Sequence, residues 1–106
     1  MSKVVFLVGN LGEVERVGAL PYIQALTNLN LVEIKERIMD KNPLAEFIID
    51  GENHSQKVKQ IMQWLGIAEQ KKITLRIYEI NDEDDFLSMD DTSSYEIDKD
   101  TLLSFI

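Results

Sequence analysis

Four adjacent carboxylates, Asp82 to Asp85, are the first residues of this 106-residue sequence that could do chemistry. Carboxylates that converge on one point can hold a divalent cation. Neighbouring residues point in different directions in a helix or a strand, so these four cannot all reach one ion. The segment also lacks the glycine and the glutamate that a calcium-binding loop has at its sixth and twelfth positions. We therefore predict no metal site.

Two other features invite a catalytic or cofactor-binding interpretation. Residues 9–12, GNLG, follow an apolar run, but the spacing G-x-G-x-x-G and the motif G-K-[ST] of nucleotide-binding loops are absent. We interpret this stretch as a connecting turn. His54 is the only histidine, has no nucleophile motif beside it, and is expected to face solvent or to start a helix. Cysteine is absent as well. The sequence predicts a non-enzymatic protein without a cofactor.

The acidic residues gather near the end of the sequence. Residues 81–106 hold nine of the 19 acidic residues and one of the 11 basic ones, so they carry the whole net charge of −8. Residues 1–80 are neutral overall. Because no basic stripe could replace the counterions of a nucleic acid, we predict no direct nucleic-acid binding. The apolar run after Lys3 is too short for a signal peptide or a membrane span, so we expect a cytoplasmic protein without membrane contact.

Large apolar residues are interleaved with these acids. A segment that only kept the protein in solution would not need such residues. Burying a side chain such as Phe86 or Leu102 gains about 1.5–3 kcal/mol, so we expect some of them to pack against the rest of the protein. We predict a compact domain over residues 1–80 and an acidic, apolar extension over residues 81–106 that docks partly on it. Within the extension, SYEID is expected to add an edge strand, and DKDTLLSFI a short helix capped by Asp98 or Asp100.

The extension is also the predicted binding surface. Phe86 or Leu87 would anchor a complex, and the carboxylates would speed the encounter with a protein that presents a basic surface. Lys35 and its helix form a second candidate face. The predicted contact residues are Asp82, Asp84, Asp85, Phe86, Leu87, Asp90, Asp91 and Lys35. The predicted function is a protein-binding adaptor or regulator, with a homodimer left open.

An acidic mimic of nucleic acid is the alternative function. Such a mimic would occupy the basic channel of a DNA- or RNA-binding enzyme. It needs carboxylates spread over a folded face at phosphate-like spacing, whereas these cluster in one terminal segment. This clustering favours the adaptor.

Six elements are predicted in the compact domain, in the order strand, helix, helix, strand, helix, strand. They cover residues 3–8, 21–26, 31–41, 45–50, 55–65 and 72–80. Asn30 with Glu33 forms a capping box for the second helix. The third helix has an apolar stripe of Val58, Ile61, Met62 and Leu65, with Asn53 or Ser55 to cap it and Gly66 to end it. Trp64 beside the stripe is expected in the core.

The strands carry simpler signals. Gly51 is predicted to end the second strand. In the last strand, alternation predicts that Ile73, Leu75 and Ile77 face the core while Thr74, Arg76 and Tyr78 face water.

A short motif suggests a family. Thr27 to Lys35 is T-N-L-N-L-V-E-I-K, and Pro43 and Gly51 follow it. With these residues the segment from Val4 to Glu79 resembles the C-terminal domain of the bacterial ribosomal stalk protein of the large subunit, whose motif is like T-G-L-G-L-K-E-A-K. The resemblance implies an α+β fold in which a three-stranded antiparallel sheet packs against three helices.

The sequence departs from the family pattern at positions that should leave the fold intact but remove a binding surface. Asn28 and Asn30 replace two turn glycines, and asparagine tolerates positive φ well, so the fold is still expected. The family's first long helix presents lysine and arginine to translation factors, whereas Pro21 and Gln24 stand at the matching positions here. We therefore expect the stalk-like fold without its basic factor-binding surface.

Overall fold

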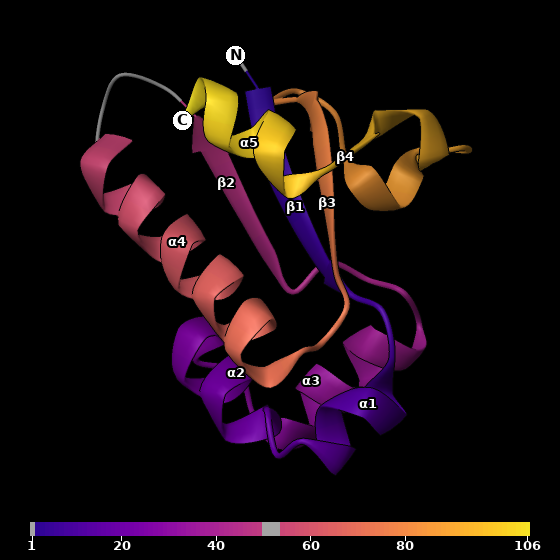
Figure 1. The fold of residues 1–106 in the computed structure, drawn as a ribbon. Helices are drawn as coiled ribbons and strands as arrows, with labels where there is room; N and C mark the ends of the chain where they lie inside the picture. Colours follow the sequence, from indigo (N-terminus) through magenta and orange to yellow (C-terminus); the bar gives the residue numbers. More distant parts are fainter. Residues whose placement is uncertain (1, 50–53) are drawn as a thin grey trace.

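The chain folds as a four-stranded antiparallel sheet with helices on one face and beyond one end (Figure 1). The computed structural model describes residues 2–49 and 54–106. The strands are β1 (Ser2–Val8), β2 (Ala45–Ile49), β3 (Leu75–Asn81) and β4 (Glu96–Ile97), in the order β2-β1-β3-β4. The helices in the described residues are α1 (Leu11–Arg16), α2 (Leu20–Thr27), α3 (Leu31–Met39), α4 (His54–Lys71) and α5 (Lys99–Phe105). Two 3-10 turns are η1 (Phe86–Ser88) and η2 (Ser93–Tyr95).

β1 is the central strand and is buried on both faces. Its residues Val4 to Val8 are all buried, and it pairs antiparallel with β2 on one side and β3 on the other. Val5, for example, lies opposite Tyr78 of β3. A strand covered on both faces has no polar side, which explains why its sequence is a continuous apolar run.

The main core lies between the helices and one face of the sheet. α4 and α5 cross this face, and α1 to α3 lie beyond one end of the strands (Figure 1). Phe6 packs edge-on against Trp64 of α4, with ring centroids 5.9 Å apart, so the expected core position of Trp64 is confirmed. Leu102 of α5 is fully buried here. The C-terminal segment is therefore part of the main core.

The α+β class is confirmed, but the predicted layout of three strands and three helices was wrong in detail. β4 pairs with β3 through Ile77 and Tyr78, which adds the edge strand expected from SYEID. α5 begins at the expected cap, where the Asp98 carboxylate accepts a hydrogen bond from the Thr101 N–H at 2.7 Å. α1 was not predicted. Its cap is Asn10, within the stretch interpreted as a plain turn, and Asn10 accepts from the Glu13 N–H at 3.0 Å.

The segment from Thr27 to Lys35 folds as its residues suggest. Asn28 has φ of 60°, the left-handed conformation that asparagine tolerates. Asn30 caps α3 by accepting from the Glu33 N–H at 2.8 Å, so this predicted cap is confirmed.

α4 continues past Gly66, which was predicted to end it. The helix stops at Lys71, where Lys72 takes φ of 56° and the Ile73 N–H donates to the Ala68 carbonyl at 3.1 Å. This is a Schellman ending with lysine where glycine is usual. Burial of Ile73 in the main core outweighs the cost of about 0.5–1 kcal/mol that a glycine adds inside a helix.

Some details of the third predicted helix differ or lie outside the described residues. Met62, expected in the buried stripe, is exposed, because Trp64 and Leu65 take the inward positions. The predicted strand end at Gly51 and one of the two predicted caps, Asn53, lie outside the described residues. The other predicted cap, Ser55, was wrong, because α4 already begins at His54.

Candidate functional site

The second face of the sheet is covered by the acidic segment. Tyr78, predicted to face water, is 4% exposed and packs edge-on against Phe86, with ring centroids 5.0 Å apart. The buried residues of this second core are Val5, Leu7, Tyr78, Ile80 and Phe86. Thr74 and Arg76 are exposed as predicted, but the prediction for Tyr78 was wrong, because alternation along one strand cannot reveal a later segment that folds back over it.

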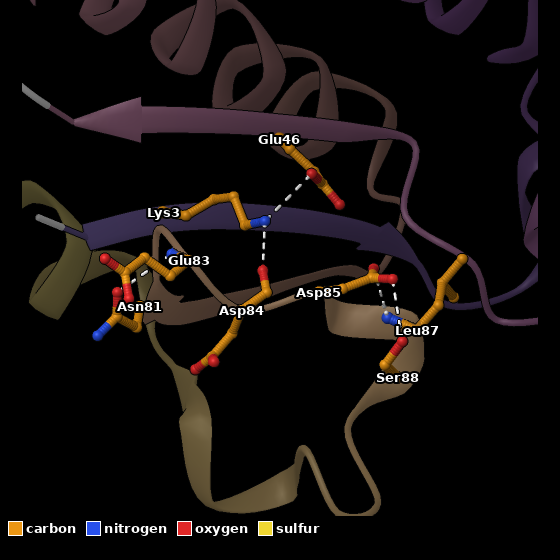
Figure 2. Close-up of polar contacts among 8 residues, drawn as sticks. All are labelled: Lys3, Glu46, Asn81, Glu83, Asp84, Asp85, Leu87 and Ser88. Carbon is orange, nitrogen blue, oxygen red and sulfur yellow. Dashed lines mark hydrogen bonds and ion pairs between the residues drawn. The ribbon is translucent and has the colours of Figure 1, made fainter.

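Phe86 and Leu87, neighbours in η1, differ sharply in burial. The Asp85 carboxylate caps this turn by accepting hydrogen bonds from the Leu87 N–H at 3.2 Å and the Ser88 hydroxyl at 3.0 Å (Figure 2). Phe86 is 6% exposed and Leu87 is 61% exposed. The prediction of Phe86 as an exposed contact residue needs correction, because its ring belongs to the second core. Of the two predicted anchors, Leu87 is the accessible one.

Lys3 of β1 ties the segment to the domain. Its ammonium donates a hydrogen bond to the Asp84 backbone carbonyl at 2.6 Å and lies 3.6 Å from the Glu46 carboxylate of β2 (Figure 2). The Lys3 side chain is only 11% exposed, whereas its partners Glu46 and Asp84 stay in contact with water. The turn after β3 is held further by Asn81, whose side chain accepts from the Glu83 N–H at 3.1 Å.

Four of the five predicted acidic contact residues divide into two groups. Asp85 and Asp91 hold local turns, since Asp91 accepts hydrogen bonds from the Ser93 hydroxyl at 2.7 Å and the Ser93 N–H at 3.0 Å. The hydroxyl, followed by the N–H, lowers the pKa of the Asp91 carboxyl. The carboxylates of Asp84 and Asp90 are exposed and make no hydrogen bond or ion pair within the described part of the chain.

Asp98 has a purely local role in the same segment. Its bonds from Thr101, first the backbone N–H and then the side chain, lower the pKa of the Asp98 carboxyl. Asp82 is half-buried at the start of the segment. The carboxylates best placed to meet another molecule are therefore those of Asp84 and Asp90.

A hollow of about 410 Å³ lies beside Leu87. Its other walls come from Arg37 of α3 and from residues 42–46, which lead into β2. The Arg37 guanidinium donates to the Pro43 carbonyl at 3.2 Å and to the Glu33 carboxylate at 3.0 Å, which holds this loop in place. The hollow can accept a side chain of another molecule next to the exposed Leu87.

Lys35, the second predicted face, has a different neighbour. Its ammonium lies 3.7 Å from the Glu15 carboxylate of α1, so its observed partner is a helix and not the acidic segment. Sequence reasoning missed Lys3 and Glu46 as part of the surface. No local signal links Lys3 to Asp84, because the two residues are 81 positions apart.

The described residues, 2–49 and 54–106, contain neither a cluster of metal ligands nor a membrane-spanning helix. Within these ranges no three histidine, cysteine, aspartate or glutamate side chains come together as a metal site would require. No helix of the described chain is long and apolar enough to cross a membrane.

No protein-family model, curated protein or solved structure matches this chain. The resemblance to the ribosomal stalk domain, and what it implies for function, stays a prediction.

Proposed function

We propose that this protein is a non-enzymatic interaction module, an adaptor or regulator, that binds a basic surface of another protein through residues 82–91. One observation carries the proposal. The acidic segment packs on a neutral domain, with Phe86 buried inward, Lys3 bonded to its backbone, and Leu87 and Asp84 left outside. A surface ordered in advance loses less conformational entropy on binding.

The residues of this surface have separate roles in the proposal. Leu87 and the hollow beside it supply the apolar anchor. The carboxylates of Asp84 and Asp90 attract a basic partner and raise the rate of encounter. Asp85 and Asp91 act indirectly, by shaping η1 and the turn before η2. The face around Lys35 would be a second contact area, and the setting would be the cytoplasm.

Reversing the charge of exposed residues within 82–91 tests the proposal. Asp84→Lys combined with Asp90→Lys changes two carboxylates that hold no observed structural contact. Asp100→Lys is the control, since α5 packs its Leu102 on the opposite face of the sheet. Proteins captured from the source cells by the unaltered chain are purified, and their affinities for each variant are measured at several salt concentrations.

The double variant should lose about tenfold in affinity at low salt and less at high salt, because the Debye length falls from about 10 Å at 0.1 M to about 3 Å at 1 M. Leu87→Ala should weaken binding at every salt concentration. The proposal would be refuted if the double variant and Leu87→Ala bound the partner with the same affinity as the unaltered chain.

Two further points sharpen this experiment. Point substitutions are preferable to a chain ending at Ile80, which would lack Phe86 of the second core and Leu102 of the main core. Adding duplex DNA or RNA as competitor separates the alternative function, since a nucleic-acid mimic must be displaced from its partner by nucleic acid. If the partner stays bound in the presence of the competitor, the mimic is refuted and the adaptor function remains.

A further inference from the structure

A cleft of about 710 Å³ opens between α4, β3 and the start of α5. Its floor is apolar and is formed by Leu65, Ala68, Ile73, Leu75, Ile77 and Ile97. Its polar lining comes from Ser93, Glu69, Glu96, Asp98 and Lys99. The cleft shares no lining residue with the hollow beside Leu87, so it is a second and separate surface.

The cleft contains an open strand edge. Among the described residues β4 pairs only with Ile77 and Tyr78, so Leu75 at the start of β3 lies beyond its end. The Gly9 N–H donates to the Thr74 carbonyl at 2.9 Å, which places the Thr74 backbone groups on the side of β1. Backbone groups alternate between the two sides of an antiparallel strand, so those of Leu75 point to the outer edge. An extended chain could pair there.

The rim of the cleft already binds cationic side chains. The Lys99 ammonium donates to the Glu69 carboxylate at 3.1 Å, which connects the start of α5 to α4. The Arg76 guanidinium lies 3.9 Å from the Glu96 carboxylate. All these side chains are substantially exposed, so the pairs are weak and can exchange with an incoming cation. The three carboxylates of the lining still outnumber Lys99 and the neighbouring Arg76, so the cleft keeps a net negative charge.

We infer that this cleft docks an extended peptide segment of a partner protein, with alternating large apolar and basic residues. The segment pairs with the backbone of Leu75 as an added strand, the mode by which many domains capture peptides at a sheet edge. Its apolar side chains enter the floor between Ala68 and Ile97. Its lysine or arginine side chains point to the other face of the sheet, where they meet Glu96, and one at the end of the segment beside α4 replaces Lys99 at Glu69.

A peptide panel tests the inference on the full chain. The probes are capped hexapeptides that alternate lysine with leucine, isoleucine or phenylalanine, and a matched set with glutamate in place of lysine. Each is titrated into isotope-labelled protein at about 50 mM salt, where screening is modest. The lysine set should shift the amide signals of Ala68, Leu75 and Ile97 with a Kd below about 1 mM, and the glutamate set should not.

Two substitutions locate the binding. Ala68→Phe fills the cleft from α4 and should weaken peptide binding about tenfold or more, whereas Ala25→Phe on the exposed side of α2 should not. Lys99→Gln frees Glu69 and should tighten binding about two- to fivefold, the range expected for releasing an exposed ion pair. Thermal unfolding of each variant checks that it is folded.

The outcomes separate this inference from the proposed function. Failure of every lysine peptide to bind below about 1 mM overturns the peptide cleft, and so does unchanged binding by a folded Ala68→Phe variant. If binding is lost with Asp84→Lys and Asp90→Lys but kept with Ala68→Phe, the peptides use the acidic segment, which overturns the cleft and supports the proposed function. Loss with Ala68→Phe alone supports the cleft.

Discussion

The two faces of the sheet are covered in different ways. One face is packed by helices and shares a core to which residues 2–49 and 54–106 contribute fifteen buried side chains, from α1 to α5. The other is closed by the acidic segment, where the described part of the chain contributes a smaller buried cluster: Val5, Leu7, Tyr78 and Ile80 from the strands, and Phe86 from η1. β1 supplies residues to both cores.

The first face mainly stabilises the fold, whereas the second carries the proposed binding surface. Many contacts from several helices hold the first face, so losing one side chain there affects the whole fold. The second face is held by Phe86, by Met89 packed against the same cluster and by the Lys3 interaction, so removing Phe86 should loosen the segment while the domain remains folded. A segment retained by few contacts belongs to the less stable part of a protein, where binding surfaces are often found.

Leu102→Ala should produce the largest loss of stability. Leu102 is fully buried in the main core, and truncating a buried leucine costs about 2–5 kcal/mol through lost burial and the cavity left behind. Urea denaturation followed by circular dichroism measures the change. Leu103→Ala, on the exposed side of α5, is the control and should change the free energy of unfolding by less than about 0.5 kcal/mol. Similar values for both would mean that α5 is not part of the main core.

Phe86→Ala should have a smaller and more local effect. Because the segment can move away without leaving a cavity, the loss should be close to the burial of one side chain, about 1.5–3 kcal/mol. Hydrogen exchange should show lost protection in residues 82–91 while β1 and α4 stay protected. Leu87→Ala, a change to the exposed neighbour, is the control. If Phe86→Ala unfolds the whole molecule, the two faces form one cooperative unit.

Acidification should give the smallest effect, confined to the turns of the C-terminal segment. Hydrogen bonds hold the pKa of Asp91 and of Asp98 below the ordinary value. A lowered pKa in the folded state stabilises the fold above the unfolded pKa of about 3.9, and this contribution is lost as pH falls through the folded pKa. The amide signals of Ser93 and Thr101 should therefore titrate below pH ~3.9. Titration at or above that value would contradict these caps.

Local features could be predicted because they depend on neighbouring residues. Asn30 and Asp98 cap their helices through bonds that span three positions, and the apolar run in β1 needs only its own residues to indicate a buried strand. The short helix α1 was missed because its six residues give too little periodicity, although Asn10 followed by Glu13 offered a weak capping signal. Gly66 misled because packing of Ile73 placed the helix end further on.

The amino-acid sequence by itself determined the α+β class, the neutral first 80 residues and the acidity of the last quarter, since composition and local periodicity are properties of neighbouring residues. Only the tertiary structure decided that Phe86 is buried and Leu87 exposed, that Tyr78 is covered, and that Lys3 holds the backbone of Asp84. These outcomes depend on which distant segment meets each face of the sheet. That choice is made by burial and hydrogen bonding in three dimensions and has no local sequence signal.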